Sequence, residues 1–387
     1  MKKAANSKQP LRNTKMSIED LKSRIDRTLT SVDLPLAADV ISNLPVYDCA
    51  ALASALSDEQ QRAALKAEIG NNVLTGSGAF VMRGAYADTS VIDAATEIFL
   101  DIIRQEKETK ESGADHFAAD GANDRIWNSL EKLCRANPEV YALYHGNEWI
   151  ELASEAWLGP AFQMTAQVNL VRPGGKAQEA HCDYHLGFLT AEQVESYPPH
   201  VHAFSPQLTL QGAIAHCDMP IESGTTKLLP FSQTWPENYL KYRDADTRAV
   251  FEERYVQIPL NKGDLLFFSP GILHAAGDNI TADIDRMANL IQVSSAFGQA
   301  MESINRVDMC KMIYPVFLNG TLSKSQIQAA IASTGEGYPF PTSLDTDPPV
   351  GGLAPQSQQQ LMHQGLDEGW SADQFNAALD AREAKRR

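Results

Sequence analysis

The second part of the chain limits the possible folds most, because it is divided into many short apolar runs. From Phe162 onward these runs are separated by turns rich in Gly, Pro and Asp. Several short strands at this spacing are typical of a sandwich or a barrel. The predicted strands cover residues 163–171, 207–215, 227–229, 256–260, 265–268 and 288–297.

The first part of the chain predicts helices instead. Ser17 precedes Glu19 and Asp20, which is the pattern of a helix N-cap with acidic residues in the first turn. Apolar residues at helical spacing predict the remaining elements, which are helices over 36–41, 52–69, 89–105, 127–136 and 148–158 and one strand over 76–82. Helices followed by strands indicate an α+β fold, a jelly-roll-like (cupin-like) barrel with flanking N-terminal helices.

The same patterns divide the chain into four segments. Residues 1–16 are polar, and we expect a disordered N-terminus; residues 17–75 form a helical N-terminal extension. Residues 76–300 form the jelly-roll domain with its helical flank. Residues 301–387 form a C-terminal extension that is partly irregular, with a terminal helix from Ser371. The polar, glycine-containing stretch 108–124 predicts a loop or a mobile flap near the functional site.

Composition excludes several classes of function. The 387 residues are 43% hydrophobic with a net charge of −16, so the surface repels phosphate backbones and anionic lipid, and neither nucleic acid nor membrane is an expected partner. The five cysteines have no C-x-x-C spacing and indicate free thiols in a reducing compartment. No apolar stretch is long enough for a spanning helix, and we expect a cytoplasmic protein. Nothing in the sequence indicates an oligomeric state.

One motif in the barrel region predicts a metal site. His181 and Asp183 lie two residues apart in a segment predicted to be extended, so both side chains point the same way. His274, which follows a Gly263-Asp264 turn and an apolar strand, supplies a third ligand from another strand. Two histidines and one carboxylate leave one side of the metal open, as in non-haem Fe(II) oxygenases. The alternatives are a strand histidine beside a surface acid, and an exposed His274.

Two other groups compete for the same role. His-Cys-Asp occurs at 181–183 and again at 216–218, but Asp218 is followed at once by Met219-Pro220, which indicates the end of a strand with a turn-forming Asp. His185 is four residues from His181, and an extended chain separates such positions by roughly 13 Å. His185 is therefore a pocket residue or a hydrogen-bonded histidine of the barrel wall.

Three polar residues are candidates for binding a co-substrate. Arg286 precedes the last predicted strand; a buried guanidinium needs an anion, and its planar fork fits a carboxylate. The alternative is a surface arginine paired with Asp283 or Asp285. Gln167 and Asn169 share one face of their strand and either line the site or only satisfy the polarity of the barrel.

The motifs also follow one another in a fixed order. They are His181-x-Asp183, the run Ser-Gly-Thr-Thr-Lys-Leu-Leu-Pro at 223–230, Gly263-Asp264 leading to His274, and then Asn279 and Arg286. With this set, residues 76–298 resemble the phytanoyl-CoA dioxygenase family of Fe(II)/2-oxoglutarate-dependent oxygenases. In that family a strand ends in Asp, a turn follows, and the next strand leads to Pro-Gly-Ser-His. Here Asp218 and Ser223-Gly224 occupy that run, Pro-Phe-Ser-Gln stands at 230–233, and Ala275 and Ala276 follow the distal histidine.

The resemblance implies a double-stranded β-helix in which His181, Asp183 and His274 hold iron. It implies that Arg286 binds the distal carboxylate of 2-oxoglutarate, and that O₂ takes the last open position. The implied reaction converts 2-oxoglutarate to succinate and CO₂ while oxidising a substrate. Related halogenases lack the carboxylate ligand, so Asp183 favours hydroxylation.

Two other functions remain open at this point. One is a cupin-like hydrolase or isomerase that uses Zn²⁺ or Mn²⁺, and the other is a jelly-roll binding module without catalysis. Because the barrel region shows no clustered Lys or Arg, a free small-molecule substrate is favoured over a CoA thioester. Tyr184, His185 and Phe188 are the candidate pocket residues beside the metal.

Overall fold

The computed structural model describes residues 17–109 and 123–386. The predicted disorder of residues 1–16 lies outside the described residues. So does most of the loop predicted over 108–124, whose ends belong to a helix and a strand.

The largest element is a mixed eight-stranded sheet in the order β1-β2-β3-β8-β6-β10-β5-β4. Neighbouring strands are antiparallel except for β2 and β3, which run parallel. Its strands are β1 (Asp39–Ile41), β2 (Leu44–Asp48), β3 (Ala79–Arg83), β4 (Asn123–Ile126), β5 (Gln163–Val171), β6 (Thr209–Ala215), β8 (Leu265–Phe268) and β10 (Arg286–Ser294). A second sheet pairs β7 (Lys227–Leu229) with β9 (Leu273–Ala275). Helices around a mixed sheet confirm the α+β class.

Strand β10 separates the core from the interior cavity. It pairs along its whole length with β5 and over seven residues with β6. Met287, Ile291 and Val293 point into the main apolar core, whereas Ala288, Leu290 and Gln292 line a cavity on the other face. Because side chains alternate along the strand, one face of the sheet packs in the apolar core and the other face lines the cavity.

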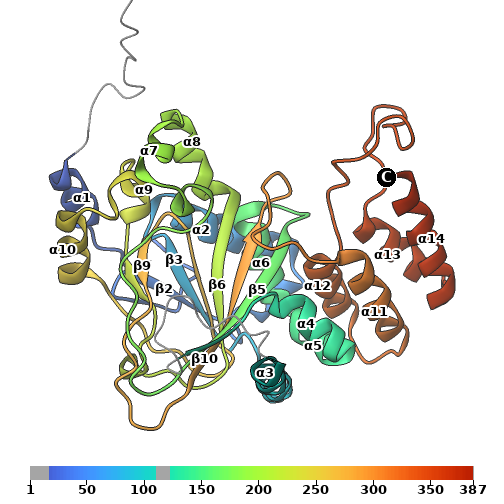
Figure 1. Ribbon diagram of the computed structural model, residues 1–387, viewed down its shortest axis with the longest axis horizontal. Coiled ribbons are helices and arrows are strands. Elements are labelled where there is room, and N and C mark those ends of the chain that lie inside the picture. The colour runs from blue at the N-terminus through green and yellow to red at the C-terminus, as the bar shows by residue number, and fades with distance from the viewer. Residues whose placement is uncertain (1–16, 110–122, 387) are drawn as a thin grey trace, which may run out of the picture.

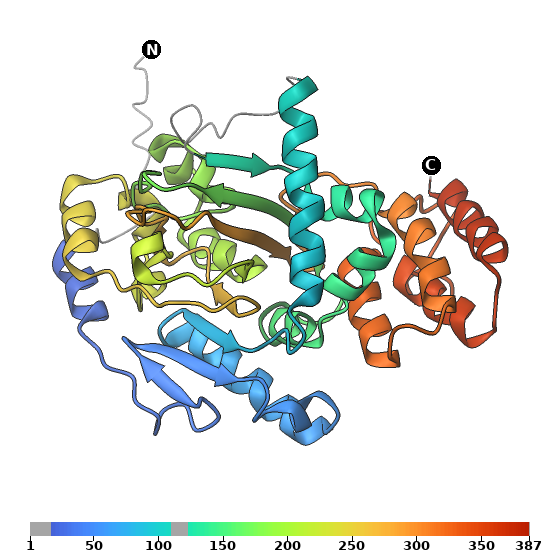
Figure 2. The same ribbon diagram turned by 90° about the horizontal axis from the view of Figure 1, so that it is seen from below.

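Helices cover the core face of the sheet and extend the molecule at one end (Figures 1 and 2). The longest helix, α3 (Ser90–Thr109), buries Ile92, Ala95, Phe99 and Ile103 at helical spacing. Figure 2 shows the C-terminal helices, in orange and red, at the end opposite the dark blue helix α1. The other helices are α1 (Ile18–Ile25), α2 (Glu59–Thr75), α4 (Ser129–Ala136), α5 (Pro138–His145), α6 (Glu148–Leu158), α7 (Ala191–Glu195), α8 (Pro199–Phe204), α9 (Asn238–Lys241), α10 (Ala245–Arg254), α11 (Arg306–Leu318), α12 (Lys324–Thr334), α13 (Gln358–Asp367) and α14 (Ala372–Lys385).

Most of the predicted elements are confirmed, and two are wrong. The helix predicted over 36–41 is wrong, because β1 and β2 form a hairpin whose turn, Ser42-Asn43, has positive φ at both residues and contains no glycine to signal it. The strand predicted over 256–260 is also wrong: Val256 and Leu260 each make only an isolated bridge. The terminal helix is confirmed as α14, but α11, α12 and α13 were not predicted.

Asp264 of the Gly-Asp motif is a structural residue. It is buried, accepts backbone N–H groups from Gly84 and Asn261 at 2.8 Å, and pairs with Arg83 at 3.2 Å. A carboxylate with these partners joins the start of β8 to the end of β3. Across residues 17–109 and 123–386, no helix has the length and apolar character needed to cross a membrane.

Candidate metal centre

A cavity of about 730 Å³ lies against the inner face of the large sheet. Strands β4, β5, β6, β8 and β10 form one side, and the segment around residues 177–188, together with β9, forms the other. His181, Asp183 and His274 all line it. Within the described part of the chain, they are the one group of three side chains placed to share a metal ion, with ligand atoms within 4.8 Å of one another.

Backbone hydrogen bonds bring the two histidines together. The N–H of His181 donates to the carbonyl of His274 at 2.9 Å, and the N–H of His274 donates back to His181 at 3.0 Å. Asp183 is fixed in the same way by its N–H, which donates to the carbonyl of Pro270 at 3.1 Å. The spacing of the ligands is therefore set by main-chain pairing between two segments far apart in sequence.

The hydrogen bonds of the rings also fix which nitrogens are free. Nδ1 of His181 lies 2.8 Å from the carbonyl of Glu179, and Nδ1 of His274 lies 2.9 Å from the carbonyl of Ile272. Because a carbonyl only accepts, each Nδ1 carries the hydrogen and each Nε2 keeps its lone pair. The Nε2 atoms lie 3.7 and 3.4 Å from the oxygens of Asp183, and this donor set suits a divalent transition metal.

The charge states of the ligands suit a cation as well. Burial acts to raise the pKa of Asp183, but the neighbouring His274 and His181 and the hydrogen bond from Gln211 outweigh it and hold the pKa well below its usual range. Burial and the neighbouring His274 lower the pKa of His181. The site thus offers an ionised carboxylate and a neutral imidazole near pH 7.

Arg286 is the first residue of β10 and is only 7% exposed. Burial lowers the pKa of its guanidinium to about 10. It donates to the carbonyl of Gly224, and among the described residues it has no ion pair with Asp283, Asp285 or any other acid. A buried cation whose protein partner is neutral favours an anionic ligand in the same cavity.

Gln167 and Asn169 line the cavity from β5, on the face expected from their spacing. Gln167 Oε1 accepts from Arg125 at 3.2 Å, and Asn169 Oδ1 is buried without a hydrogen-bond partner in the described chain. Arg125 and Arg243 also line the cavity, so with Arg286 it holds three guanidinium groups. Sequence reasoning missed this grouping because the three arginines lie far apart in the chain.

The competing histidines lie elsewhere. His216 is buried, with Nδ1 2.7 Å from Thr96 Oγ1 and Nε2 2.7 Å from the hydroxyl of Tyr144, so both ring nitrogens already have partners. Asp218 accepts the N–H of Lys262 at 2.9 Å, as expected of a turn residue. His185 is not among the residues that line the cavity, and its Nδ1 lies 3.3 Å from Ser205 Oγ.

Of the other two candidate pocket residues, one lines the cavity and the other does not. Phe188 lines the cavity and is 58% exposed, at the mouth. Tyr184 is buried away from the cavity lining, and its backbone has a φ of 64°. The chain therefore turns directly after Asp183, which sends Tyr184 and His185 away from the ligands.

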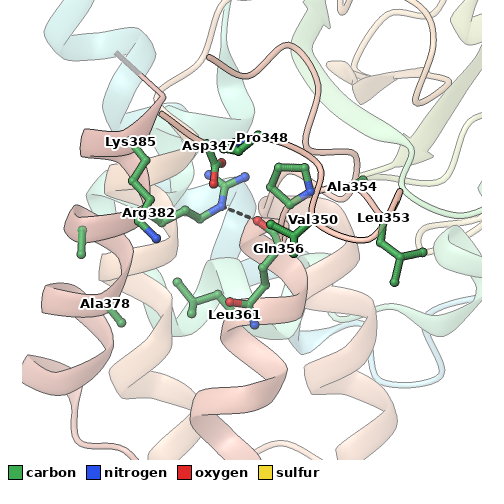
Figure 3. Close-up of a pocket in the computed structure, with 12 residues that line it drawn as sticks. Asp347, Pro348, Val350, Leu353, Ala354, Gln356, Leu361, Ala378, Arg382 and Lys385 are labelled. Atoms are coloured by element: carbon green, nitrogen blue, oxygen red, sulfur yellow. Dashed lines mark hydrogen bonds between the residues drawn. The ribbon is translucent and has the colours of Figure 1, made fainter. Parts of the chain in front are cut away.

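A second cavity, of about 300 Å³, lies between α13, α14 and the chain that precedes them (Figure 3). Arg382 lines it but is held by the carbonyl of Gln356 at 2.7 Å and by Glu336 at 3.3 Å. Asp347 is the one metal-ligating side chain among its described lining residues. This cavity does not bring together the groups needed for metal chemistry.

Comparison with known proteins then identifies the family. Residues 49–288, more than half of the chain, match the family described as phytanoyl-CoA dioxygenase (PhyH). The chain belongs to the phytanoyl-CoA dioxygenase family. Enzymes of this family are oxidoreductases that use Fe(II), 2-oxoglutarate and O₂, and the donor set of two histidines and one aspartate fits that iron.

Several solved structures are similar to this member of the family at low identity. The non-heme alpha-ketoglutarate-dependent epimerase SnoN from nogalamycin biosynthesis is 19% identical, with a TM-score of 0.43, over 62% of this chain and 82% of its own. The carbocyclase SnoK from the same biosynthesis is 19% identical, with a TM-score of 0.44, over 59% and 83%. A complex of SnoN with Fe3+, alpha-ketoglutarate and nogalamycin RO is 18% identical, with a TM-score of 0.44, over 69% and 94%. No curated protein matches the chain.

Proposed function

We propose that this protein is an Fe(II)- and 2-oxoglutarate-dependent dioxygenase that hydroxylates a small molecule and releases succinate and CO₂. One observation carries the proposal: the ligand atoms of His181, Asp183 and His274 converge in the cavity that also contains the buried Arg286. A metal-binding face and an unpaired buried cation in one cavity match the two ends of a dicarboxylate co-substrate.

We also infer that the barrel is a double-stranded β-helix. The large sheet provides one layer, and the β7–β9 pair, extended by the bridges of His181 to His274 and of Leu228 to Val256, provides the facing layer. In this interpretation residues 76–300 form the catalytic jelly-roll domain, the extension at 17–75 adds β1 and β2 to the edge of its sheet, and a second extension covers 301–387. A cytoplasmic location also remains a prediction.

Each residue then has a defined task. His181, Asp183 and His274 would hold the iron, which with 2-oxoglutarate and O₂ supplies the oxidising power for attack on an unactivated C–H bond. Arg286 would bind the distal carboxylate of 2-oxoglutarate through its planar fork. Gln167 and Asn169 present amide groups to the same cavity and would bind the co-substrate with Arg286.

Apolar side chains of the cavity would limit the access of water to the co-substrate. Leu290, Ala213 and Phe268 line the same cavity as Arg286 and the metal ligands. Excluding water strengthens the ion pair between a carboxylate and Arg286, because charges interact more strongly where the dielectric is low. Phe188 lines the cavity and is exposed, so a substrate that enters from solvent on that side would meet it.

The remaining alternatives are less well supported. A hydrolase or isomerase with Zn²⁺ or Mn²⁺ needs no buried cation opposite the metal, so Arg286 favours the oxygenase. A binding module without catalysis does not need free Nε2 atoms on two histidines directed at one carboxylate. Hydroxylation is favoured over halogenation because Asp183 supplies the carboxylate ligand.

The test compares the two His-Cys-Asp motifs. Purified protein with Fe(II) and 2-oxoglutarate should show the weak visible band of the chelate without oxygen, and should release succinate when air is admitted. Asp183→Ala should lose both signals, whereas Asp218→Ala, the same change in the second motif, should keep them. If the wild-type protein gives no band and no more succinate than Asp183→Ala, the proposed function is wrong. Substrate depletion from a metabolite extract, followed by mass spectrometry, then identifies the oxidised compound.

A further inference from the structure

The three metal-ligand candidates are held by different kinds of partner. The Nδ1 atoms of His181 and His274 bond to main-chain carbonyls, which no substitution removes directly. The carboxylate of Asp183 is held by a side chain instead: Gln211 Nε2 donates to Asp183 Oδ2 at 2.6 Å. Among the described residues, Gln211 is thus the residue outside the three candidate ligands whose side chain bonds to one of their side-chain atoms.

Gln211 is placed to hold that bond rigidly. It lies within β6 and is 2% exposed. Its strand is paired on both sides, so Gln211 stands opposite Gln292 of β10 and opposite Phe268 of β8. A residue between two hydrogen-bonded strands has little freedom to move, and its side chain reaches Asp183 from a fixed origin.

The direction of the bond follows from the charge of Asp183. An ionised carboxylate only accepts, so the amide group that faces it must be the NH₂ of Gln211. A bond from an amide to an ionised oxygen is stronger than one between neutral groups. Oδ2 also lies 3.4 Å from Nε2 of His274, whereas Asp183 Oδ1 has no hydrogen bond among the described residues and lies 3.7 Å from Nε2 of His181.

We propose that Gln211 is a positioning residue that occupies Oδ2 of Asp183 and leaves Oδ1 as the single oxygen for the metal. This inference rests on the proposed function. Carboxylates can bind a metal through one oxygen or through two. A second bound oxygen would take one of the three positions that 2-oxoglutarate and O₂ require, so holding Oδ2 keeps those positions open. Partners of this kind typically contribute 10- to 100-fold in metal affinity.

The neighbouring Gln292 provides a matched control. It lines the same cavity, is 6% exposed, and stands directly opposite Gln211, but it has no hydrogen bond to any of the three ligands. Gln211→Met and Gln292→Met remove the same amide group at nearly the same depth, and methionine keeps the length of the side chain. A role in general packing affects both variants alike, whereas a role in positioning Asp183 affects only the first.

The experiment measures Mn(II) binding to the metal-free full-length protein by titration followed with electron paramagnetic resonance, with and without 2-oxoglutarate. We expect Gln211→Met to weaken Mn(II) binding by about 10- to 100-fold and Gln292→Met to leave it unchanged. Thermal unfolding of the metal-free variants separates loss of affinity from loss of fold. If Gln211→Met does not fold, Gln211→Asn keeps an amide but draws it back from Oδ2 by one methylene, and should weaken binding in the same direction.

The outcomes are distinguishable. Equal Mn(II) affinity in the wild-type protein and the folded Gln211 variant overturns the positioning role while the proposed function stands. Equal weakening in the Gln211 and Gln292 variants assigns the effect to packing and also overturns it. A wild-type protein that binds no Mn(II) with 2-oxoglutarate overturns the proposed function and this inference together.

Discussion

Arg286 offers a test in which stability and binding change in opposite directions. Its guanidinium is 7% exposed and donates to the carbonyl of Gly224, so the fold keeps a charge inside without a protein anion among the described residues. Replacing it by methionine, Arg286→Met, keeps a long side chain and removes the charge. We expect this variant to lose 2-oxoglutarate binding without losing stability.

The magnitude follows from the pKa of the group. Burial lowers the pKa of Arg286 from 12.5 to about 10, and each unit corresponds to about 1.4 kcal/mol, so keeping the charge in the ligand-free fold costs about 3 kcal/mol. The variant avoids that cost but loses the hydrogen bond to Gly224, which contributes about 1.5–3 kcal/mol for a charged donor. The ligand-free variant should therefore be between equal to the wild type and about 2 kcal/mol more stable.

When the co-substrate is present, the wild-type protein should become more stable than the variant. With Mn(II) and 2-oxoglutarate at 100 times its dissociation constant, the wild-type free energy of unfolding should rise by about 2.7 kcal/mol, because the ligand binds only the folded state. The variant should gain nothing from 2-oxoglutarate. Urea unfolding with Mn(II), with and without 2-oxoglutarate, measures both effects. A variant that 2-oxoglutarate stabilises as much as the wild type, or one that is clearly less stable without ligand, would refute the reasoning.

Two further predictions concern stability. Burial raises the pKa of Glu302 from 4.5 to about 7. Between these two pH values the folded state holds a proton that the unfolded state has lost. The stability that this proton contributes is fully present below pH 4.5 and disappears as the pH rises through 7. The free energy of unfolding of Glu302→Gln relative to wild type should rise by up to about 3 kcal/mol between pH 4.5 and pH 8, and a difference independent of pH would contradict this. A Cβ at Gly212 would lie 2.7 Å from Phe267 Cδ1 and 2.8 Å from Ile291 Cγ1, so Gly212→Ala should lose about 1–3 kcal/mol in urea unfolding. An unchanged midpoint of urea unfolding would contradict this and would show that Phe267 and Ile291 move to accommodate the added methyl group.

Local patterns in the sequence predicted much of the scaffold. The alternation of β5 and the apolar run of β8 are complete within a few residues, so both strands were found with their observed bounds. The hairpin of β1 and β2 was missed because its turn, Ser42-Asn43, lacks glycine. Helix α11 was missed because it carries Pro315 inside and mixes polar and apolar residues around its circumference.

The functional site also contains residues that local spacing predicts and residues that it does not. His181 and Asp183 are neighbours in sequence, so their shared direction could be inferred from spacing alone. Gln211 could not be found in this way, because its contact with Asp183 exists only through the register that aligns β6 with β8 and β10. Arg125 was missed for a similar reason, since its approach to Gln167 depends on the pairing of β4 with β5.

The reciprocal backbone bonds between His181 and His274 give a bound ion a second effect. The chain from 172 to 188 has one isolated bridge and one short 3-10 turn, so few contacts of regular structure order it. An ion shared by both histidines ties this segment to β9 and closes a long loop, as a covalent cross-link would. Because the ion would add to the main-chain bonds that already hold this segment, we expect metal binding to slow proteolysis within residues 172–188.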